Sequence, residues 1–173
     1  MTVTDVNVVK SAIFERPDDA NKGTLGSLLC VCGSYGMAGA AVMSAKGALR
    51  TGIGLAKCAL PRSIYPIVAQ TILESVYYPL SENADGRISK VNVPFLVSES
   101  CKSSATLVGC GLGMCDDTLK IVFSLIENST TPLVLDADAL NCVAKQPEIL
   151  LKKKAPIIIT PHPGEMSRLT GLA

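Results

Sequence analysis

Short apolar runs alternate with segments of helical periodicity along most of this 173-residue chain. Six runs are predicted as strands: Leu25–Cys32, Leu55–Leu60, Glu74–Leu80, Ala105–Cys110, Pro132–Asp136 and Pro156–Thr160. The helices predicted between them are Gly39–Thr51, Arg62–Ile72, Val93–Cys101, Asp116–Glu127 and Asp138–Leu150, and a last helix begins at Pro163. Strands rich in Val, Leu and Ile that alternate with helices are typical of a parallel sheet covered on both faces. The pattern therefore predicts a three-layer α/β/α domain with a mostly parallel sheet.

The beginning of the chain differs from the rest. Residues 1–23 are polar and contain Pro17, Asp18, Asp19 and Asn21, so we expect an N-terminal arm, followed by one domain over residues 24–173. The first ten residues lack the basic start and apolar run of a signal peptide, and no apolar stretch reaches 18 residues. We therefore expect a soluble, cytoplasmic protein that does not cross a membrane.

The composition argues against several classes of binding partner. The net charge is +1, the aromatic content is 4% and there is no Trp, which argues against nucleic acid, anionic membranes and base-stacking surfaces. The seven cysteines form no C-x-x-C pair and most lie in apolar runs, so we expect reduced, buried thiols and no metal site.

In parallel sheets, ligands bind beyond the carboxyl ends of the strands, so the residues that follow each strand are the most informative. Two of these segments are rich in glycine. Gly33–Ala41 has glycine at every third position, which differs from the dinucleotide fingerprint G-x-G-x-x-G, and Gly109–Gly113 has alternating glycines. Glycine lets a backbone approach a ligand closely, and a helix that follows offers free N–H groups to an anion. The alternative is that both segments are tight or flexible turns.

The fifth predicted strand ends in two carboxylates. Asp138 is predicted to cap the next helix, whereas Asp136 must find a partner or face the cleft. Asn141, one turn further along, could also face the cleft.

After the sixth strand, His162 is the only histidine of the chain and lies between two prolines. Pro163 suits the first helical position, which puts His162 at the cap. The amides of Gly164, Glu165 and Met166 are then predicted to be free for a ligand. Glu165 also complements the helix dipole, which is its purely structural interpretation.

Taken together, these segments resemble the NAD(P)H-hydrate dehydratase family of the ribokinase-like superfamily. The resemblance is carried, in order, by residues 21–26, 33–41, 48–54, 109–113, 135–141 and 159–171, and the last of these contains Thr-Pro-His-Pro-Gly-Glu. No one segment is distinctive alone, but the ordered set is specific.

The resemblance implies a lyase that repairs NADH or NADPH to which water has been added. ADP or ATP, with Mg²⁺, phosphorylates the added hydroxyl, and phosphate then leaves. It also implies a homo-oligomer, a tetramer by analogy. The substrate-binding residues implied are Ala40, Gly111, Gly113, Asp136, Asn141, His162, Gly164 and Glu165.

The chain departs from the family pattern in two places. Cys110 stands where the family usually has proline. The family's nucleotide loop and its Gly-Thr-Gly-Asp segment, which carries the catalytic base, are not found up to Ala173. We therefore expect a ribokinase-like domain without its C-terminal part, with no catalytic residue in this chain and little turnover from the chain alone. Two alternatives stay open: a kinase of a thiamine precursor, whose relatives tend to carry Thr-Pro-Asn here, and a non-catalytic nucleotide-binding fragment.

Overall fold

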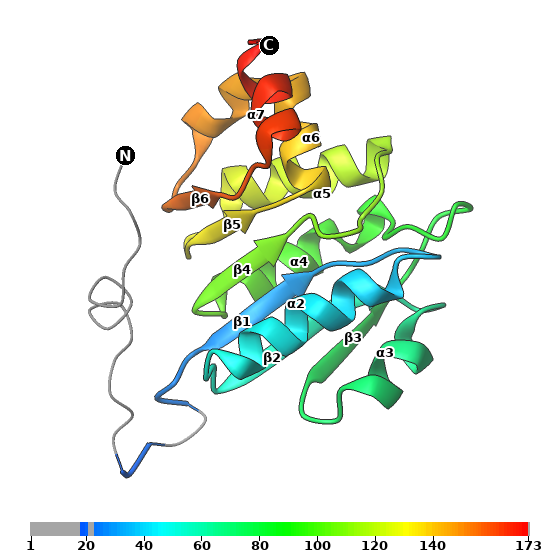
Figure 1. Ribbon diagram of the computed structural model, residues 1–173, viewed down its shortest axis with the longest axis vertical. Coiled ribbons are helices and arrows are strands. Elements are labelled where there is room, and N and C mark those ends of the chain that lie inside the picture. The colour runs from blue at the N-terminus through cyan, green and yellow to red at the C-terminus, as the bar shows by residue number, and fades with distance from the viewer. Residues whose placement is uncertain (1–17, 21–22, 173) are drawn as a thin grey trace.

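A computed structural model describes residues 18–20 and 23–172, so most of the predicted N-terminal arm lies outside the described residues. The strands form one sheet in the order β3-β2-β1-β4-β5-β6, and every neighbouring pair is parallel (Figure 1). They are β1 Ser27–Val31, β2 Leu55–Pro61, β3 Val76–Leu80, β4 Ala105–Val108, β5 Leu133–Leu135 and β6 Ile157–Ile159. The predicted parallel sheet is confirmed. The carboxyl ends of all six strands lie at one side, called here the carboxyl edge.

The helices are α2 Ala38–Arg50, α3 Tyr65–Thr71, α4 Val93–Cys101, α5 Asp116–Asn128, α6 Asp138–Lys145 and α7 Pro163–Thr170, with short 3₁₀ turns η1 Lys90–Asn92 and η2 Pro147–Lys152. The predicted helix Asp138–Leu150 is wrong in its second half, because α6 ends at Lys145. Pro147 has no N–H to donate and disfavours helical backbone at the residue before it, and Gln146 accordingly adopts φ −152° and ψ 75°.

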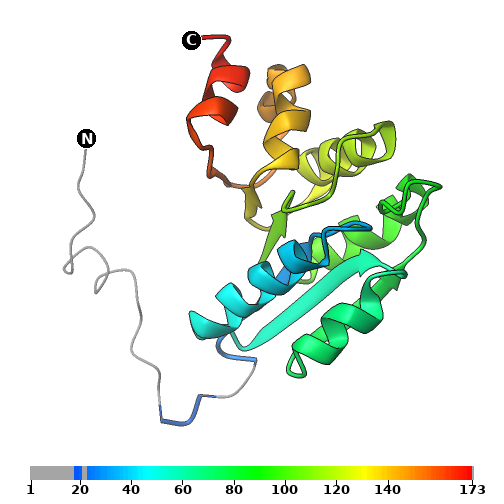
Figure 2. The same cartoon turned by 45° about the vertical axis from the view of Figure 1, so that its right-hand side comes forward.

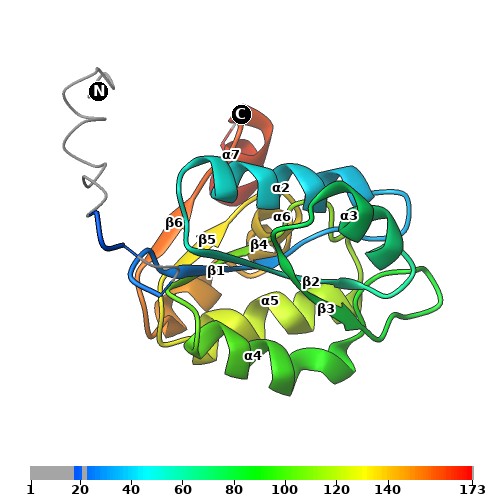
Figure 3. The same cartoon turned by 90° about the horizontal axis from the view of Figure 1, so that it is seen from below.

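Helices lie on both faces of the sheet (Figure 3). On one face α2 and α3 cover a cluster that includes Cys30, Cys58 and Leu60. On the other face α4, α5 and α6 cover a second cluster around Leu29 and Val108. The three-layer α/β/α architecture predicted from the sequence is therefore present.

The two helical layers do not extend equally far across the sheet. On the α2 side, Leu107, Val134 and Ile158 are register partners on β4, β5 and β6. Within residues 18–20 and 23–172 no helix covers Ile158, whose exposed fraction is 59%. Figure 2 shows α7 beside α6, at the end of the sheet opposite α3. The apolar sheet surface over β4–β6 is thus partly open.

All seven cysteines are free, and Cys30, Cys32, Cys58 and Cys142 are buried. The burial of these four is as expected, whereas Cys110 is only half-buried. Among the described residues, no helix combines the length and apolar character that a membrane crossing requires.

Candidate functional site

The loops that follow β1 and β4 touch each other at the carboxyl edge. The Gly33 N–H donates to the Cys110 carbonyl at 2.8 Å, and the Ser34 hydroxyl donates to the Gly111 carbonyl at 2.8 Å. A Cβ atom added at Gly111 would lie 2.7 Å from the Cβ of Ala40. Ala40, at the start of α2, is therefore in direct contact with Gly111, as the absence of a side chain there allows.

A chain of polar contacts links the second glycine-rich loop to the last two helices. The Gly113 N–H donates to Asp138 Oδ2 at 2.8 Å, and Asn141 Nδ2 lies 3.4 Å from Asp138 Oδ1. The Arg168 Nε–H donates to Asn141 Oδ1 at 2.9 Å. A Cβ at Gly164 would lie 3.6 Å from Arg168 Nη1. These contacts connect the loop after β4, through Asp138 and Asn141, to Arg168 of α7 beside Gly164.

The predicted capping role of Asp138 is wrong. Ala137 occupies the cap position of α6, at φ 49° and ψ −114°, and no side chain caps the helix. A positive φ is unfavourable for a residue with a Cβ. This conformation turns the Asp138 carboxylate away from its own helix amides and toward Gly113.

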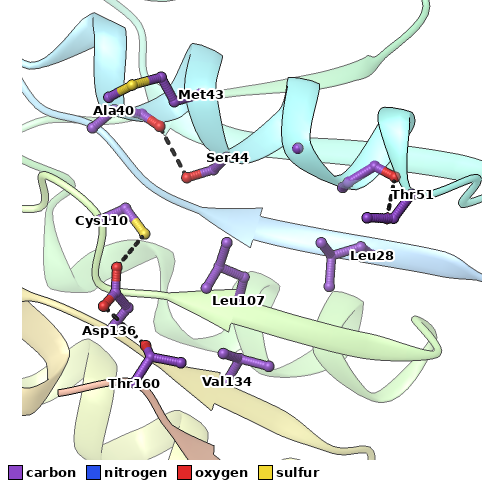
Figure 4. A pocket seen from close by; sticks show the side chains of 12 residues that line it. Leu28, Ala40, Met43, Ser44, Thr51, Leu107, Cys110, Val134, Asp136 and Thr160 are labelled. Atoms are coloured by element: carbon purple, nitrogen blue, oxygen red, sulfur yellow. Dashed lines mark hydrogen bonds between the residues drawn. The ribbon is translucent and has the colours of Figure 1, made fainter. Parts of the chain in front are cut away.

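Asp136 lies at the polar end of a cavity of about 580 Å³ (Figure 4). Its Oδ1 accepts a hydrogen bond from Thr160 Oγ1 at 2.9 Å, and its Oδ2 accepts one from Cys110 Sγ at 3.2 Å. Apolar side chains of β1, β4 and β5 line the same cavity: Leu28, Leu107 and Val134. Asp136 therefore both has partners and faces a cavity, the two outcomes predicted for a carboxylate at this strand end.

Cys110 has a more acidic thiol than an ordinary cysteine. Hydrogen bonds with Cys32, first, and with Ser44 lower the pKa of Cys110, and together they outweigh the opposing effects of burial and of Asp136. Burial has the reverse effect on Cys142, whose pKa it raises to about 12. The thiol beside the cavity is thus the one that ionises more readily.

His162 is held by its own helix. It is the N-cap of α7, and its Nδ1 accepts a hydrogen bond from the Gly164 N–H at 3.1 Å. The Glu165 carboxylate accepts from the His162 N–H at 3.0 Å and lies 3.3 Å from His162 Nε2. Since Nδ1 is an acceptor, the neutral ring carries its proton on Nε2. The Glu165 side chain is 8% exposed and the His162 side chain 62% exposed, so a buried carboxylate orients an accessible imidazole.

The prediction that the first amides of α7 are free for a ligand is wrong. The Gly164 N–H is bonded to the histidine ring, and the N–H groups of Glu165 and Met166 both donate to the His162 carbonyl at 3.0 Å. The group that this turn presents to a ligand is the imidazole.

One part of the carboxyl edge was not predicted. The hairpin of residues 82–88 follows β3 and is closed by a bridge between Glu82 and Ile88. The Tyr35 N–H donates to the Gly86 carbonyl at 2.8 Å, and Arg87 lies against Gly113. The sequence indicates a turn at residues 83–86, but nothing in it shows that this turn contacts both glycine-rich loops.

Solved structures define the class of fold. A ribokinase-like superfamily protein from Enterococcus faecalis aligns with a TM-score of 0.77 at 20% identity, over 93% of this chain and 54% of that one. The ADP/ATP-dependent NAD(P)H-hydrate dehydratase from Bacillus subtilis, co-crystallised with ATP and Mg²⁺, aligns with a TM-score of 0.73 at 29% identity, over 95% of this chain and 54% of that one. The fold is therefore that of the ribokinase-like superfamily.

The sequence gives the family. Residues 28–173 match the NAD(P)H-hydrate dehydratase family, and the chain belongs to it. The bifunctional NAD(P)H-hydrate repair enzyme of Thermofilum pendens is 38% identical over 156 residues, 90% of this chain and 30% of that protein. The ADP-dependent (S)-NAD(P)H-hydrate dehydratase of Bacillus subtilis is 30% identical over 95% of this chain and 54% of that protein. The chain thus spans about a third to a half of the relatives it matches.

Proposed function

We propose that this chain forms the substrate-binding side of an NAD(P)H-hydrate dehydratase, which restores NADH or NADPH from its hydrate at the expense of ADP or ATP. Membership of the family and the names of the relatives support this reaction. The observation that carries it is the contact network at one edge of the sheet, where Ala40 meets Gly111 and Asp138 binds Gly113.

The chemistry explains why a nucleotide is needed. Hydroxide is a poor leaving group, so the hydroxyl oxygen on the ring first takes a phosphoryl group from the nucleotide. The carbon–oxygen bond then breaks with phosphate as the leaving group while the ring nitrogen supplies the electron pair, and loss of a proton from the neighbouring ring carbon restores the reduced ring. Positioning and charge neutralisation carry most of the catalysis in such transfers.

The residues of the carboxyl edge have distinct roles in this proposal. The backbone after β4 forms the surface that the dinucleotide meets, and the missing side chains of Gly111 and Gly113 let Ala40 and Arg87 pack against it. The exposed His162 ring supplies a stacking surface, and Glu165 holds the ring in place. Gly164 keeps that turn narrow, and Asp136 and Asn141 line the cleft.

The nucleotide and Mg²⁺ come into the proposal from the relatives. Magnesium bound to a nucleotide takes carboxylate and phosphate oxygens in octahedral geometry. Within residues 18–20 and 23–172 no group of three or more metal-ligating side chains is assembled. We therefore assign none of the described residues to a magnesium–nucleotide site.

Two further parts of the proposal concern the setting of the protein. We expect it to act in the cytoplasm, where the dinucleotides are, and to form a homotetramer as the family resemblance implies. Light scattering after gel filtration measures the second directly, and a monomeric mass at working concentration contradicts it.

Titration calorimetry of the full chain tests the proposal. We expect hydrated NADH and hydrated NADPH to bind more tightly than NAD⁺, because the site is proposed to fit a non-planar, hydroxylated ring. Selective binding of a thiazole alcohol would instead support the thiamine-precursor kinase. Binding of ADP or ATP without the hydrates would support the non-catalytic nucleotide-binding fragment, and binding of none of these overturns the proposal.

A further inference from the structure

Hydrogen bonds and one buried side chain hold the hairpin of residues 82–88 in place. Asn83 organises it: its side-chain oxygen accepts the N–H groups of Asp85 and Arg87 at 3.1 Å each, and its own N–H donates to the Arg87 carbonyl at 2.9 Å. Asn83 Nδ2 also donates to Asp117 Oδ2 on α5 at 3.2 Å. Ile88, at 1% exposure, anchors the hairpin in the core. Side chains on this hairpin are thus carried by a fixed backbone.

The hairpin contacts both glycine-rich loops. Gly86 lies so close to Tyr35 of the first loop that a Cβ there would collide with the tyrosine Cβ. A Cβ at Gly113 of the second loop would collide with Nε of Arg87. Gly113 adopts φ +73°, a conformation that glycine accommodates without strain. The Arg87 side chain therefore lies directly against the loop that the proposed substrate approaches.

Part of the Arg87 guanidinium is open to a ligand, since the side chain is 29% exposed. Its Nη1 donates to Asp85 Oδ2 at 2.8 Å. The exposed fraction is 65% for the Asp85 side chain. Among the described residues Asp85 is its one side-chain partner, which leaves Nε and Nη2 without an acceptor. An ion pair with so exposed a carboxylate is worth little and exchanges easily for a better anion.

The negative charge around the proposed site favours a cation beside Gly113. Asp136, Asp138 and Glu165 put carboxylates near the proposed site, and a dinucleotide adds the negative charges of its phosphates. Arg168, on the far side, has its Nε committed to Asn141. Like charges brought together repel unless a positive group lies between them, and arginine is the residue best suited to phosphate.

We propose that the Arg87 guanidinium, held by the 82–88 hairpin against Gly113, binds a phosphate group of the hydrated dinucleotide, an inference that rests on the proposed function. The phosphate is either the diphosphate that both hydrates share or the 2′-phosphate that only hydrated NADPH carries. Its forked N–H groups donate to two oxygens of the same phosphate. Asp85 acts as the counter-ion that the substrate displaces.

The test is a set of calorimetric titrations of the full chain with hydrated NADH, hydrated NADPH and ADP. We expect Arg87→Met to weaken hydrate binding about tenfold, because it removes charge-assisted hydrogen bonds. Arg87→Lys keeps the charge but loses the fork, and we expect a loss of about threefold. Arg50→Met is the matched control: Arg50 is exposed at the end of α2, away from the carboxyl edge, and its loss leaves binding unchanged.

Comparison of the ligands identifies the phosphate. Equal losses for the two hydrates assign Arg87 to the diphosphate, and a loss confined to hydrated NADPH assigns it to the 2′-phosphate. Asp85→Asn separates charge from structure: with the counter-ion neutralised, the hydrates bind at least as tightly as to the unchanged chain. Thermal unfolding midpoints of all variants show which of them are folded.

Three results overturn the assignment of Arg87 while leaving the proposed function standing. They are unchanged hydrate binding in Arg87→Met, a loss confined to ADP, and an Asp85→Asn loss as large as that of Arg87→Met. Failure of the unchanged chain to bind either hydrate removes the proposed function itself, and this inference falls with it.

Discussion

The backbone N–H of Gly113 donates a 2.8 Å hydrogen bond to Oδ2 of Asp138. This contact joins the flexible glycine-rich loop after β4 to the first turn of α6, which is firmly packed in the core. A glycine loop can adopt many conformations, and folding must select one of them. Asp138 thus holds the loop in one conformation.

Removal of this acceptor should loosen the loop. We expect Asp138→Ala to lower the free energy of unfolding by about 1–2 kcal/mol, because a charge-assisted hydrogen bond is lost. The matched control is Asp116→Ala: Asp116 also lies in the first turn of a helix, but it is exposed, so about 0.5 kcal/mol of dipole interaction is at stake. Urea unfolding of both variants measures the difference. Equal losses would show that Asp138 acts only through the helix dipole.

Glu165 should affect hydrate binding without touching the hydrate. Since its carboxylate holds the backbone and ring of His162, we expect Glu165→Ala to weaken hydrate binding by about 1 kcal/mol, roughly fivefold. In a His162→Ala background the same change should add almost nothing, because the ring it orients is gone. Additive losses in this double-mutant cycle contradict the positioning role. Glu148→Ala, an exposed acid in η2, serves as the control.

Ala137 carries the backbone strain of the site. It is the one residue other than glycine with a positive φ in residues 18–20 and 23–172. We expect Ala137→Gly to raise the free energy of unfolding by about 1 kcal/mol, since relief of 1–3 kcal/mol of strain exceeds the added entropy of the unfolded chain. Ala144→Gly, inside α6, should lower it by about 1 kcal/mol. Thermal denaturation measures the change in the free energy of unfolding for both variants. A destabilised Ala137→Gly protein would show that Ala137 is not strained.

Buried thiols should make the protein sensitive to alkali. Burial raises the pKa of Cys142 to about 12, whereas the unfolded thiol ionises near its ordinary value. Above about pH 8.5 the unfolded chain therefore binds fewer protons than the folded chain, and stability falls as the pH rises toward 12.

Between about pH 8 and pH 10, we expect Cys142→Ala to lose about 2 kcal/mol less stability than the unchanged chain, at about 1.4 kcal/mol per pH unit above pH 8.5. Cys101→Ala, at an exposed position, should leave the pH dependence as it is. Urea midpoints at the two pH values measure this. An identical pH dependence in all three proteins would show that Cys142 titrates normally.

The strands, most of the helices and the parallel sheet could be predicted from the sequence alone. Strands such as Leu55–Pro61 and Ala105–Val108 are short apolar runs between turn residues, and their parallel pairing follows from the helices that separate them. The placement of Asp136 at a cavity and of His162 at a helix cap also follows from local rules. Residues after parallel strands necessarily share an edge.

The errors arose where one of several possible partners, distant or local, took a polar group that the sequence leaves open. Asp138 has the side chain of a cap residue, but Gly113, distant in sequence, competes for its carboxylate. The amides after Pro163 were expected to be free, but the His162 ring and carbonyl bind them. Arg87 gave no signal at all, because an arginine in a polar turn looks the same whether it faces solvent or a neighbouring loop.

The most direct test of the account is an amide NMR titration of the ¹⁵N-labelled chain with hydrated NADPH. We predict that the largest shift changes fall on the amides of Ala40, Gly111, Gly113 and Gly164, all at the carboxyl edge. Shifts confined to the opposite edge, around Gly26, Lys57 and Ser104, or no shifts at all, would contradict the placement of a dinucleotide site at the ends of these strands.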